Sequence, residues 1–125
     1  MLSSLRRGLL DEPYNTLFAE GGKKALELLE ENEVHVIVTD IFMPEMSGLE
    51  LLRIVKVKYP HIVRLVLSGY AQVTTLLMAI NQGEIYKFIT KPWKMEKDFK
   101  SVIRQAVDYY NSQIEHHERV EPTEA

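Results

Sequence analysis

Three apolar runs alternate with helix-periodic segments along this chain, and each run ends in one polar residue. VHVIVTD ends at Asp40, IVRLVLS ends at Ser68 and IYKFITK ends at Lys91. Alternation of strand-like and helical segments predicts an α/β fold, a doubly wound parallel sheet with crossover helices. Open sheets of this kind bind ligands outside the carboxyl ends of their strands. We therefore expect a carboxylate, a hydroxyl and an ammonium group to converge at one sheet edge.

The hydrophobic periods and the turn residues between them set the expected elements. A helix is expected along residues 2–10. Apolar stretches predict the strands, and spacings of three and four residues predict the helices. The expected strands are 15–19, 34–39, 62–67 and 85–89, and the further helices are 23–32, 48–58, 72–82 and 95–115. We expect one domain over residues 1–115 and a charged, frayed tail over 116–125.

Composition narrows the class of protein. The chain has 125 residues, enough for one domain with a real core, and it contains no apolar run long enough to cross a bilayer. The net charge of -3 predicts no sequence-independent nucleic-acid binding. The absence of cysteine excludes disulfides, thiolate metal sites and a cysteine nucleophile. Because the first residues lack a signal-peptide pattern, we expect a cytoplasmic protein with no membrane partner.

Each of the three polar residues also has an ordinary explanation when it is taken alone. An aspartate at a strand end is commonly a turn or N-cap residue, a serine there a turn residue, and a lysine a solvated surface charge. Asp40, Ser68 and Lys91 each end one of the three apolar runs, and this repeated placement favours a shared site instead. The glycine patterns of phosphate-binding loops are absent from the sequence.

The segments VTDIFMPEMSGLELL, LVLSGYA and GEIYKFITKPW resemble, in this order, the receiver domain of bacterial two-component response regulators over residues 2–112. The resemblance implies a flavodoxin-like receiver fold and a signalling domain, not an enzyme. It implies that Asp40 accepts a phosphoryl group from a histidine kinase, a role that carboxylate nucleophiles can fill. It also implies that Ser68 and Lys91 contact phosphoryl oxygens, and that Asp40 and the backbone carbonyl of Phe42 hold Mg²⁺.

The same resemblance implies roles for four further residues. Pro44 and Gly48 would shape the loop that presents the phosphoacceptor, and the peptide bond before Pro92 would be cis. Phe88 occupies the position of an aromatic switch, which would repack when Ser68 turns toward the phosphoryl group. Phe88 can equally be read as an ordinary core residue.

One part of the family pattern is missing. A receiver begins with a strand that ends in two acidic residues of the Mg²⁺ site, whereas this chain begins at the helix that follows. We therefore expect a receiver fold without its first strand, a weakened metal site and a gap beside strand 34–39. Either strand 15–19 fills the gap and brings Glu20 near Asp40 as a substitute ligand, or strands pair between protomers in a homodimer.

Two functions follow from these observations. The first is a phosphoacceptor domain that signals through its C-terminal helical face to an output domain or downstream protein. The alternative is a phosphorylation-independent protein-interaction module with a degenerate metal site. Asp40, Ser68 and Lys91 favour the first, and the missing acidic pair favours the second. A hydrolase that uses Asp40 as its nucleophile fits less well, because no second aspartate follows two residues later.

Overall fold

The structure is a computed structural model that describes residues 15–43, 45–69, 72–90 and 95–124. The helix expected along residues 2–10 lies outside this part of the chain. The elements, in chain order, are α2 (Gly22–Glu31), β1 (Val36–Asp40), α3 (Gly48–Lys58), β2 (Val63–Ser68), α4 (Val73–Asn81), β3 (Lys87–Thr90), the π-helix η2 (Met95–Lys100) and α5 (Ser101–Glu124).

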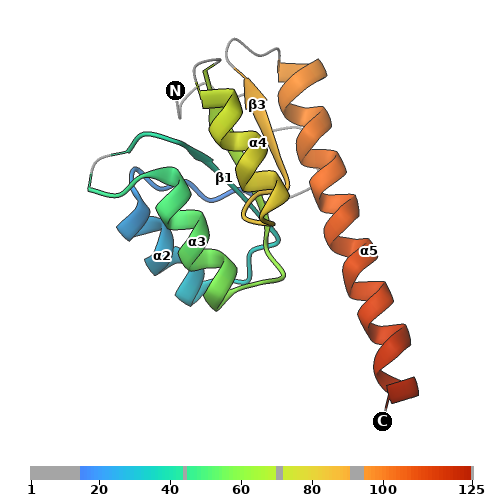
Figure 1. The fold of residues 1–125 in the computed structure, drawn as a ribbon. Coiled ribbons are helices and arrows are strands. Elements are labelled where there is room, and N and C mark those ends of the chain that lie inside the picture. The colour runs from blue at the N-terminus through green and yellow to red at the C-terminus, as the bar shows by residue number, and fades with distance from the viewer. Residues whose placement is uncertain (1–14, 44, 70–71, 91–94, 125) are drawn as a thin grey trace.

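The described strands form one parallel sheet in the order β1-β2-β3 (Figure 1). This confirms the predicted α/β fold with parallel strands and crossover helices. The register pairs Asp40 of β1 with Leu67 of β2, and Ser68 of β2 with Thr90 of β3. The carboxyl ends of all three strands therefore meet at one edge of the sheet.

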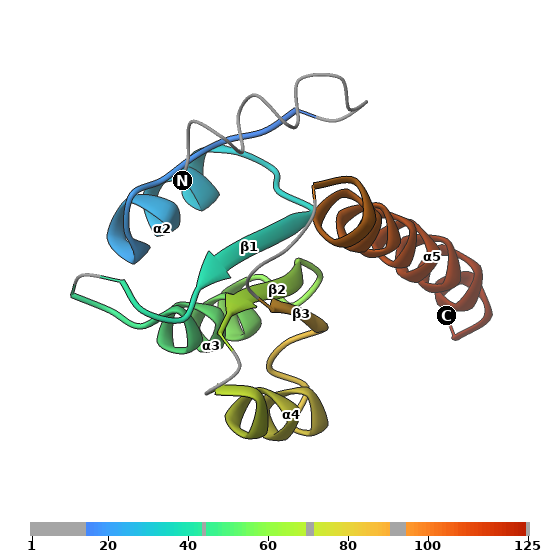
Figure 2. The same cartoon turned by 90° about the horizontal axis from the view of Figure 1, so that it is seen from above.

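Strand β2 is the centre of the core, because helices cover both of its faces. Leu65 and Val66 are fully buried and point to opposite faces, as neighbouring residues of a strand must. On one face, Leu65 packs with Phe99, Ile103 and Ala106, so η2 and α5 cover that side. On the other face, Val66 packs with residues of α3 and α4 (Figure 2), namely Leu52, Leu76 and Ala79.

Helix α2 packs against α3. Leu29 of α2 forms a cluster with Leu51 and Val55 of α3. The amino end of α2 also lies close to the loop that follows β1, since a Cβ atom at Gly22 would come within 2.7 Å of the Met46 Sδ atom. The second helix is thus tied to the segment that leads from Asp40 into α3.

Arg64 fastens the opposite, amino-terminal edge of the sheet. Its guanidinium donates hydrogen bonds to the carbonyls of Glu84 (2.9 Å), Gly83 (3.0 Å) and Ile62 (3.1 Å). Burial lowers the pKa of Arg64 from its usual value, although a guanidinium remains charged in proteins. One half-buried side chain therefore satisfies carbonyls from the turn before β3 and from the entry to β2.

Residues 15–19 correct one expectation, because they form no strand. Phe18 packs instead beside Val36 and Val38, against the core cluster that α5 covers. A strand is stable only when its backbone groups join a ladder, and burial of one aromatic ring is satisfied equally well by an irregular segment. Strand 15–19 therefore does not fill the position beside β1.

The C-terminal segment corrects a second expectation. Residues 116–124, which we expected to be frayed, continue α5 as a helix. Residues 111–121 contain no glycine or proline that would stop a helix, and glutamate, glutamine and arginine are good helix formers. Helix 48–58 has the same bounds as α3, the first turns of the helix expected from residue 95 form the π-helix η2, and the other boundaries differ from the expected ones by at most two residues. In the part of the chain that the structure describes, no helix is long and apolar enough to cross a membrane.

Replacing Arg64 by methionine should lower the free energy of unfolding by about 2 kcal/mol, because two part-buried carbonyls, of Glu84 and Ile62, and the exposed carbonyl of Gly83 lose a charged donor. Urea denaturation followed by circular dichroism measures this change. The control is Arg53→Met. Arg53 bonds only the Glu84 side chain, at 3.2 Å on the surface, and should contribute about 0.5 kcal/mol or less. Equal losses in the two variants would contradict the fastening role.

Candidate functional site

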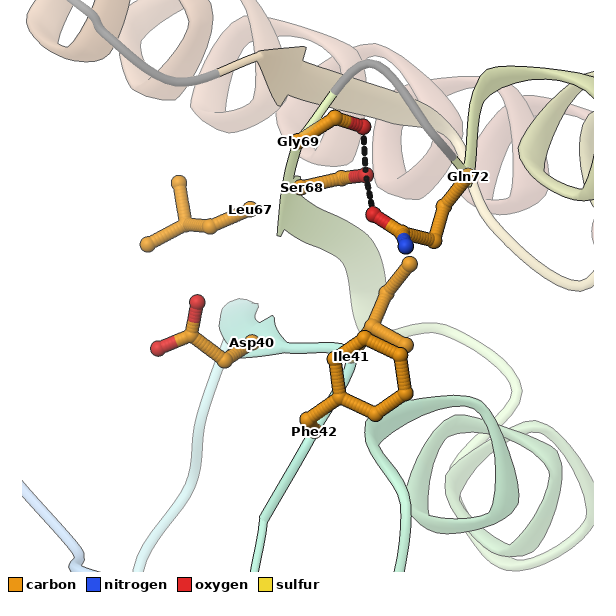
Figure 3. Close-up of a pocket in the computed structure, with 7 residues that line it drawn as sticks. All are labelled: Asp40, Ile41, Phe42, Leu67, Ser68, Gly69 and Gln72. Carbon is orange, nitrogen blue, oxygen red and sulfur yellow. Dashed lines mark hydrogen bonds between the residues drawn. The ribbon is translucent and has the colours of Figure 1, made fainter.

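The ends of β1 and β2 enclose a hollow of about 150 Å³ at the carboxyl edge of the sheet. Asp40 and Ser68, predicted to share a site, both line it (Figure 3). The other lining residues come from the two loops that leave these strands and from the start of α4: Ile41, Phe42, Leu67, Gly69 and Gln72. The parallel register brings the two polar residues together although 28 positions separate them in the sequence.

Asp40 is the last residue of β1 and is half-buried. The buried hydroxyl of Thr39 donates a hydrogen bond to the Asp40 backbone carbonyl at 3.0 Å. Phe42, two residues beyond, exposes 75% of its surface beside the hollow. The aspartate is thus held by a buried strand, while the residues after it face the solvent.

The loop after Asp40 returns tightly to start α3. Gly48 donates its N–H to the Ile41 carbonyl at 2.6 Å, and a Cβ atom on Gly48 would lie only 1.9 Å from the Asp40 carbonyl oxygen. The Ser47 hydroxyl accepts the N–H of Glu50 at 3.1 Å and so caps the helix. Only glycine permits this approach of the helix start to the backbone of Asp40. Pro44, the other residue expected to shape this loop, lies outside the described residues.

Ser68 is 3% exposed and ends β2. Its hydroxyl donates to the Gly69 carbonyl at 2.7 Å and lies 3.4 Å from Oε1 of Gln72. Figure 3 shows that this hydroxyl points toward Gly69 and Gln72, whereas the Asp40 carboxylate points elsewhere in the hollow. The two groups line one space but do not face each other.

Two of the predicted site residues, Lys91 and Pro92, lie outside the described part of the chain. Lys91 follows Thr90 directly, and Thr90 is in register with Ser68. Phe88 is half-buried and packs against the cluster of α3 and α4, beside Val66 in the sheet register. This position suits both readings of Phe88, and its switch role stays a prediction.

Glu20 does not line the hollow of Asp40. It lines a second hollow, of about 280 Å³. Gly21 and Lys23 at the start of α2 and Glu45 in the loop after β1 also line this hollow. Among the residues that the structure describes, no group of three or more His, Cys, Asp or Glu side chains is placed to hold a metal ion. Asp40 is the one carboxylate that lines its own hollow.

Sequence patterns did not point to Gln72, which the structure places beside Ser68. A signal was present in the sequence. Helix N-caps favour serine, threonine, aspartate and asparagine, and a glutamine just before the apolar stretch of α4 departs from that preference.

Comparison with known proteins agrees with this geometry. The sequence model of the response regulator receiver domain matches residues 1–103. The chain belongs to the response regulator receiver family. A hydrogenase transcriptional regulatory protein, HoxA of Cupriavidus necator, is 36% identical over 114 residues, which are 91% of this receiver and 23% of HoxA. A putative NtrX-like response regulator of Rickettsia bellii is 34% identical over 71% of this receiver and 19% of its own length. The receiver therefore spans about a quarter or less of these relatives.

Solved structures show the same fold. The signal receiver domain of an HD domain-containing protein from Pseudomonas fluorescens Pf-5 superposes with a TM-score of 0.82 at 33% identity, covering 91% of this receiver and 83% of that chain. The receiver domain of NtrX from Brucella abortus gives a TM-score of 0.77 at 27% identity, covering 85% and 88% of the two chains. These likenesses confirm the flavodoxin-like receiver fold predicted from the sequence.

Gly48→Ala should lower the free energy of unfolding of the receiver by about 2 to 3 kcal/mol, because the added methyl group overlaps the Asp40 carbonyl. Thermal and urea denaturation measure the loss. Gly21→Ala is the matched control, since a Cβ atom there meets nothing within 4 Å and the backbone is extended. That variant should change stability by about 0.5 kcal/mol or less. A Gly48 variant as stable as the control would contradict the close approach.

Proposed function

We propose that this receiver accepts a phosphoryl group from a histidine kinase on Asp40. The observation that carries the proposal is the placement of Asp40 and Ser68 on one hollow at the carboxyl edge of a parallel sheet. Ligands of open α/β sheets bind at this edge. Membership of the receiver family supports the same reaction.

In the proposed reaction a carboxylate oxygen of Asp40 forms a bond to phosphorus while the bond from phosphorus to the donor nitrogen breaks. The product is an acyl phosphate, and the kinase imidazole leaves with the electron pair of the broken bond. Phosphoryl transfer of this kind needs positioning and neutralisation of charge more than covalent help. The Ser68 hydroxyl would donate to one phosphoryl oxygen, and the Lys91 ammonium would pair with another.

The hollow beside Asp40 offers few oxygen ligands for Mg²⁺. This ion commonly uses one or two carboxylates, substrate phosphate oxygens and several waters. The Asp40 carboxylate and the Phe42 backbone carbonyl are the protein groups that would hold it here, and both residues line the hollow. When bound, Mg²⁺ neutralises charge on the transferring phosphoryl group. The single carboxylate in the hollow supports a weak site.

We place the signalling output on the face formed by α4, β3 and α5, in a cytoplasmic receiver. Phe88 packs against the cluster that Val66 of β2 forms with Leu76 and Ala79 of α4, and a change at Ser68 would reach this face through that cluster. Leu77 and Met78 of α4 expose 52% and 57% of their surface. HoxA is a transcriptional regulatory protein, and control of a transcriptional output is the corresponding proposal for this receiver.

A second candidate function is phosphorylation-independent protein binding by the same helical face. The observation that favours it is the lone carboxylate of the Asp40 hollow, since loss of metal ligands would disable phosphoryl transfer while leaving the fold intact. The two candidates differ in whether Asp40 responds to a phosphoryl mimic.

Titration of the receiver with Mg²⁺ and beryllofluoride, a mimic of the phosphoryl group, should give a saturable change in the fluorescence of Trp93, the single tryptophan. Asp40→Asn should abolish the change, because it removes the nucleophilic oxygen that binds the mimic. Intact-mass spectrometry after incubation with a small phosphoryl donor should show one added phosphoryl group in the wild type and none in Asp40→Asn.

Glu45→Gln is the control for this experiment. It removes one negative charge from the same loop, but Glu45 lines the other hollow. Its response should match that of the wild type. No response from folded wild-type protein would reject phosphoryl acceptance and favour the binding module.

We also propose that the receiver forms a homodimer through the open edge of β1. The N–H of Val63 donates to the His35 carbonyl at 2.9 Å. In a parallel ladder, alternate residues face alternate neighbours, so the backbone groups of Val36 and Val38 point away from β2. No strand pairs with them among the described residues. Open, apolar edges of this kind template pairing with another chain.

Strand β3, at the other edge of the sheet, carries a charged residue that β1 lacks. Lys87 of β3 is exposed and hydrogen-bonds Gln105 of α5, and an edge lysine discourages pairing between chains. Strand β1 has no such charge before its final residue, Asp40. The contrast favours β1 as the edge that meets a second copy.

Size-exclusion chromatography with light scattering should show a dimer that Val36→Pro weakens, because proline removes an outward N–H and is tolerated at the first residue of a strand. Val57→Lys is the control. Val57 of α3 is 82% exposed and lies away from the edge, so its replacement should leave the dimer unchanged. A stable monomer at high concentration would count against the homodimer.

A further inference from the structure

Gln72 holds the N-cap position of α4 without capping it. Its backbone has φ -102° and ψ 5°, and its side chain makes no capping hydrogen bond. Short side chains are preferred there because they reach the free N–H groups of the first turn. The side chain of Gln72 reaches instead into the hollow that Asp40 and Ser68 line (Figure 3). A broken local rule beside a functional site points to a role in that site.

The single hydrogen atom of the Ser68 hydroxyl determines the nature of the contact between Ser68 and Gln72. The Ser68 hydroxyl lies 2.7 Å from the Gly69 carbonyl and 3.4 Å from Oε1 of Gln72. A hydroxyl carries one hydrogen, so it cannot donate to both oxygens. The shorter contact takes that hydrogen. Turning the Gln72 carboxamide by half a turn exchanges its oxygen and nitrogen, and Nε2–H then donates to the Ser68 oxygen.

The resulting hydrogen bonds form a closed loop. With the carboxamide turned in this way, Gln72 would donate through Nε2 to Ser68, while Ser68 donates to the Gly69 carbonyl. The same Gly69 carbonyl accepts the backbone N–H of Gln72 at 3.3 Å. Ser68 is 97% buried, because only 3% of it is exposed, so water competes little with these bonds. The loop ties the serine hydroxyl to the first turn of α4 and directs it away from Asp40.

We propose that Gln72 is a positioning residue that latches the Ser68 hydroxyl on the Gly69 carbonyl and so opposes its turn toward a phosphoryl group on Asp40. This inference rests on the proposed phosphoryl acceptance. When the hydroxyl turns, it gives up the Gly69 carbonyl and the Gln72 donor together. The latch therefore sets how readily the site responds, and it transmits the turn of Ser68 to the start of α4.

Gln72→Leu keeps the size of the side chain and removes both of its hydrogen-bonding groups. In the full chain it should raise the affinity for beryllofluoride with Mg²⁺ roughly fivefold, the effect of one net hydrogen bond. In the Ser68→Ala background the same replacement should leave the affinity unchanged, because Gln72 acts through Ser68. Equal changes in both backgrounds, no change in either, or weaker binding in the first would overturn the latch.

A second measurement needs no phosphoryl mimic. In the nuclear magnetic resonance spectrum of the ligand-free chain, Ser68→Ala should shift the Gln72 side-chain amide and speed its hydrogen exchange several-fold. The side-chain amide of Gln105, which bonds Lys87, serves as the internal control and should not change. An unaltered Gln72 amide would overturn the latch. If beryllofluoride does not bind the wild type while the amide responds, the proposed function fails and only the hydrogen bond between Gln72 and Ser68 stands.

Discussion

The parallel register of β1, β2 and β3 is the constraint on which the rest of the receiver depends. It aligns Asp40 with Leu67, and Ser68 with Thr90, so that polar residues far apart in the sequence end their strands at one edge. The register is strongly specified because helices cover both faces of β2. A slip by one residue would turn the fully buried Leu65 and Val66 each to the face that the other now occupies. Both core clusters would be disrupted.

The two ends of the sheet are held by different means. At the amino-terminal edge, the Arg64 guanidinium gathers carbonyls from separate segments, and each bond is charge-assisted. At the carboxyl edge, the Gly48 backbone approaches the Asp40 carbonyl so closely that no side chain fits between them. The long side chain of Arg64 stabilises the amino-terminal edge, whereas the lack of a side chain at Gly48 allows the close backbone contact at the carboxyl edge. The arrangement leaves the carboxyl edge with short, tight loops around a hollow.

Two departures from local rules lie near the carboxyl edge of the sheet. Glu45 adopts a left-handed backbone with φ 69°, which side chains other than glycine rarely take. Gln72 sits at an N-cap that it does not cap. Both residues lie in loops that leave the carboxyl ends of β1 and β2. Other local signals agree with the fold, as in the capping of α3 by Ser47. A departure beside the site, such as that of Gln72, is typical of a scaffold that carries a functional group.

The sequence by itself determined the alternation of strands and helices, the parallel sheet and the residues at the strand ends, because hydrophobic period and turn residues are local properties. It could not decide whether residues 15–19 form a strand, because a strand needs a ladder partner. Nor could it decide how far the last helix runs, because α5 continues through Pro122, a residue type that usually ends helices, to Glu124. Only the tertiary structure decided that Gln72 meets Ser68 and that, among the described residues, no strand pairs with the outer edge of β1. Those facts depend on side-chain directions and strand neighbours, which spacing along a chain does not encode.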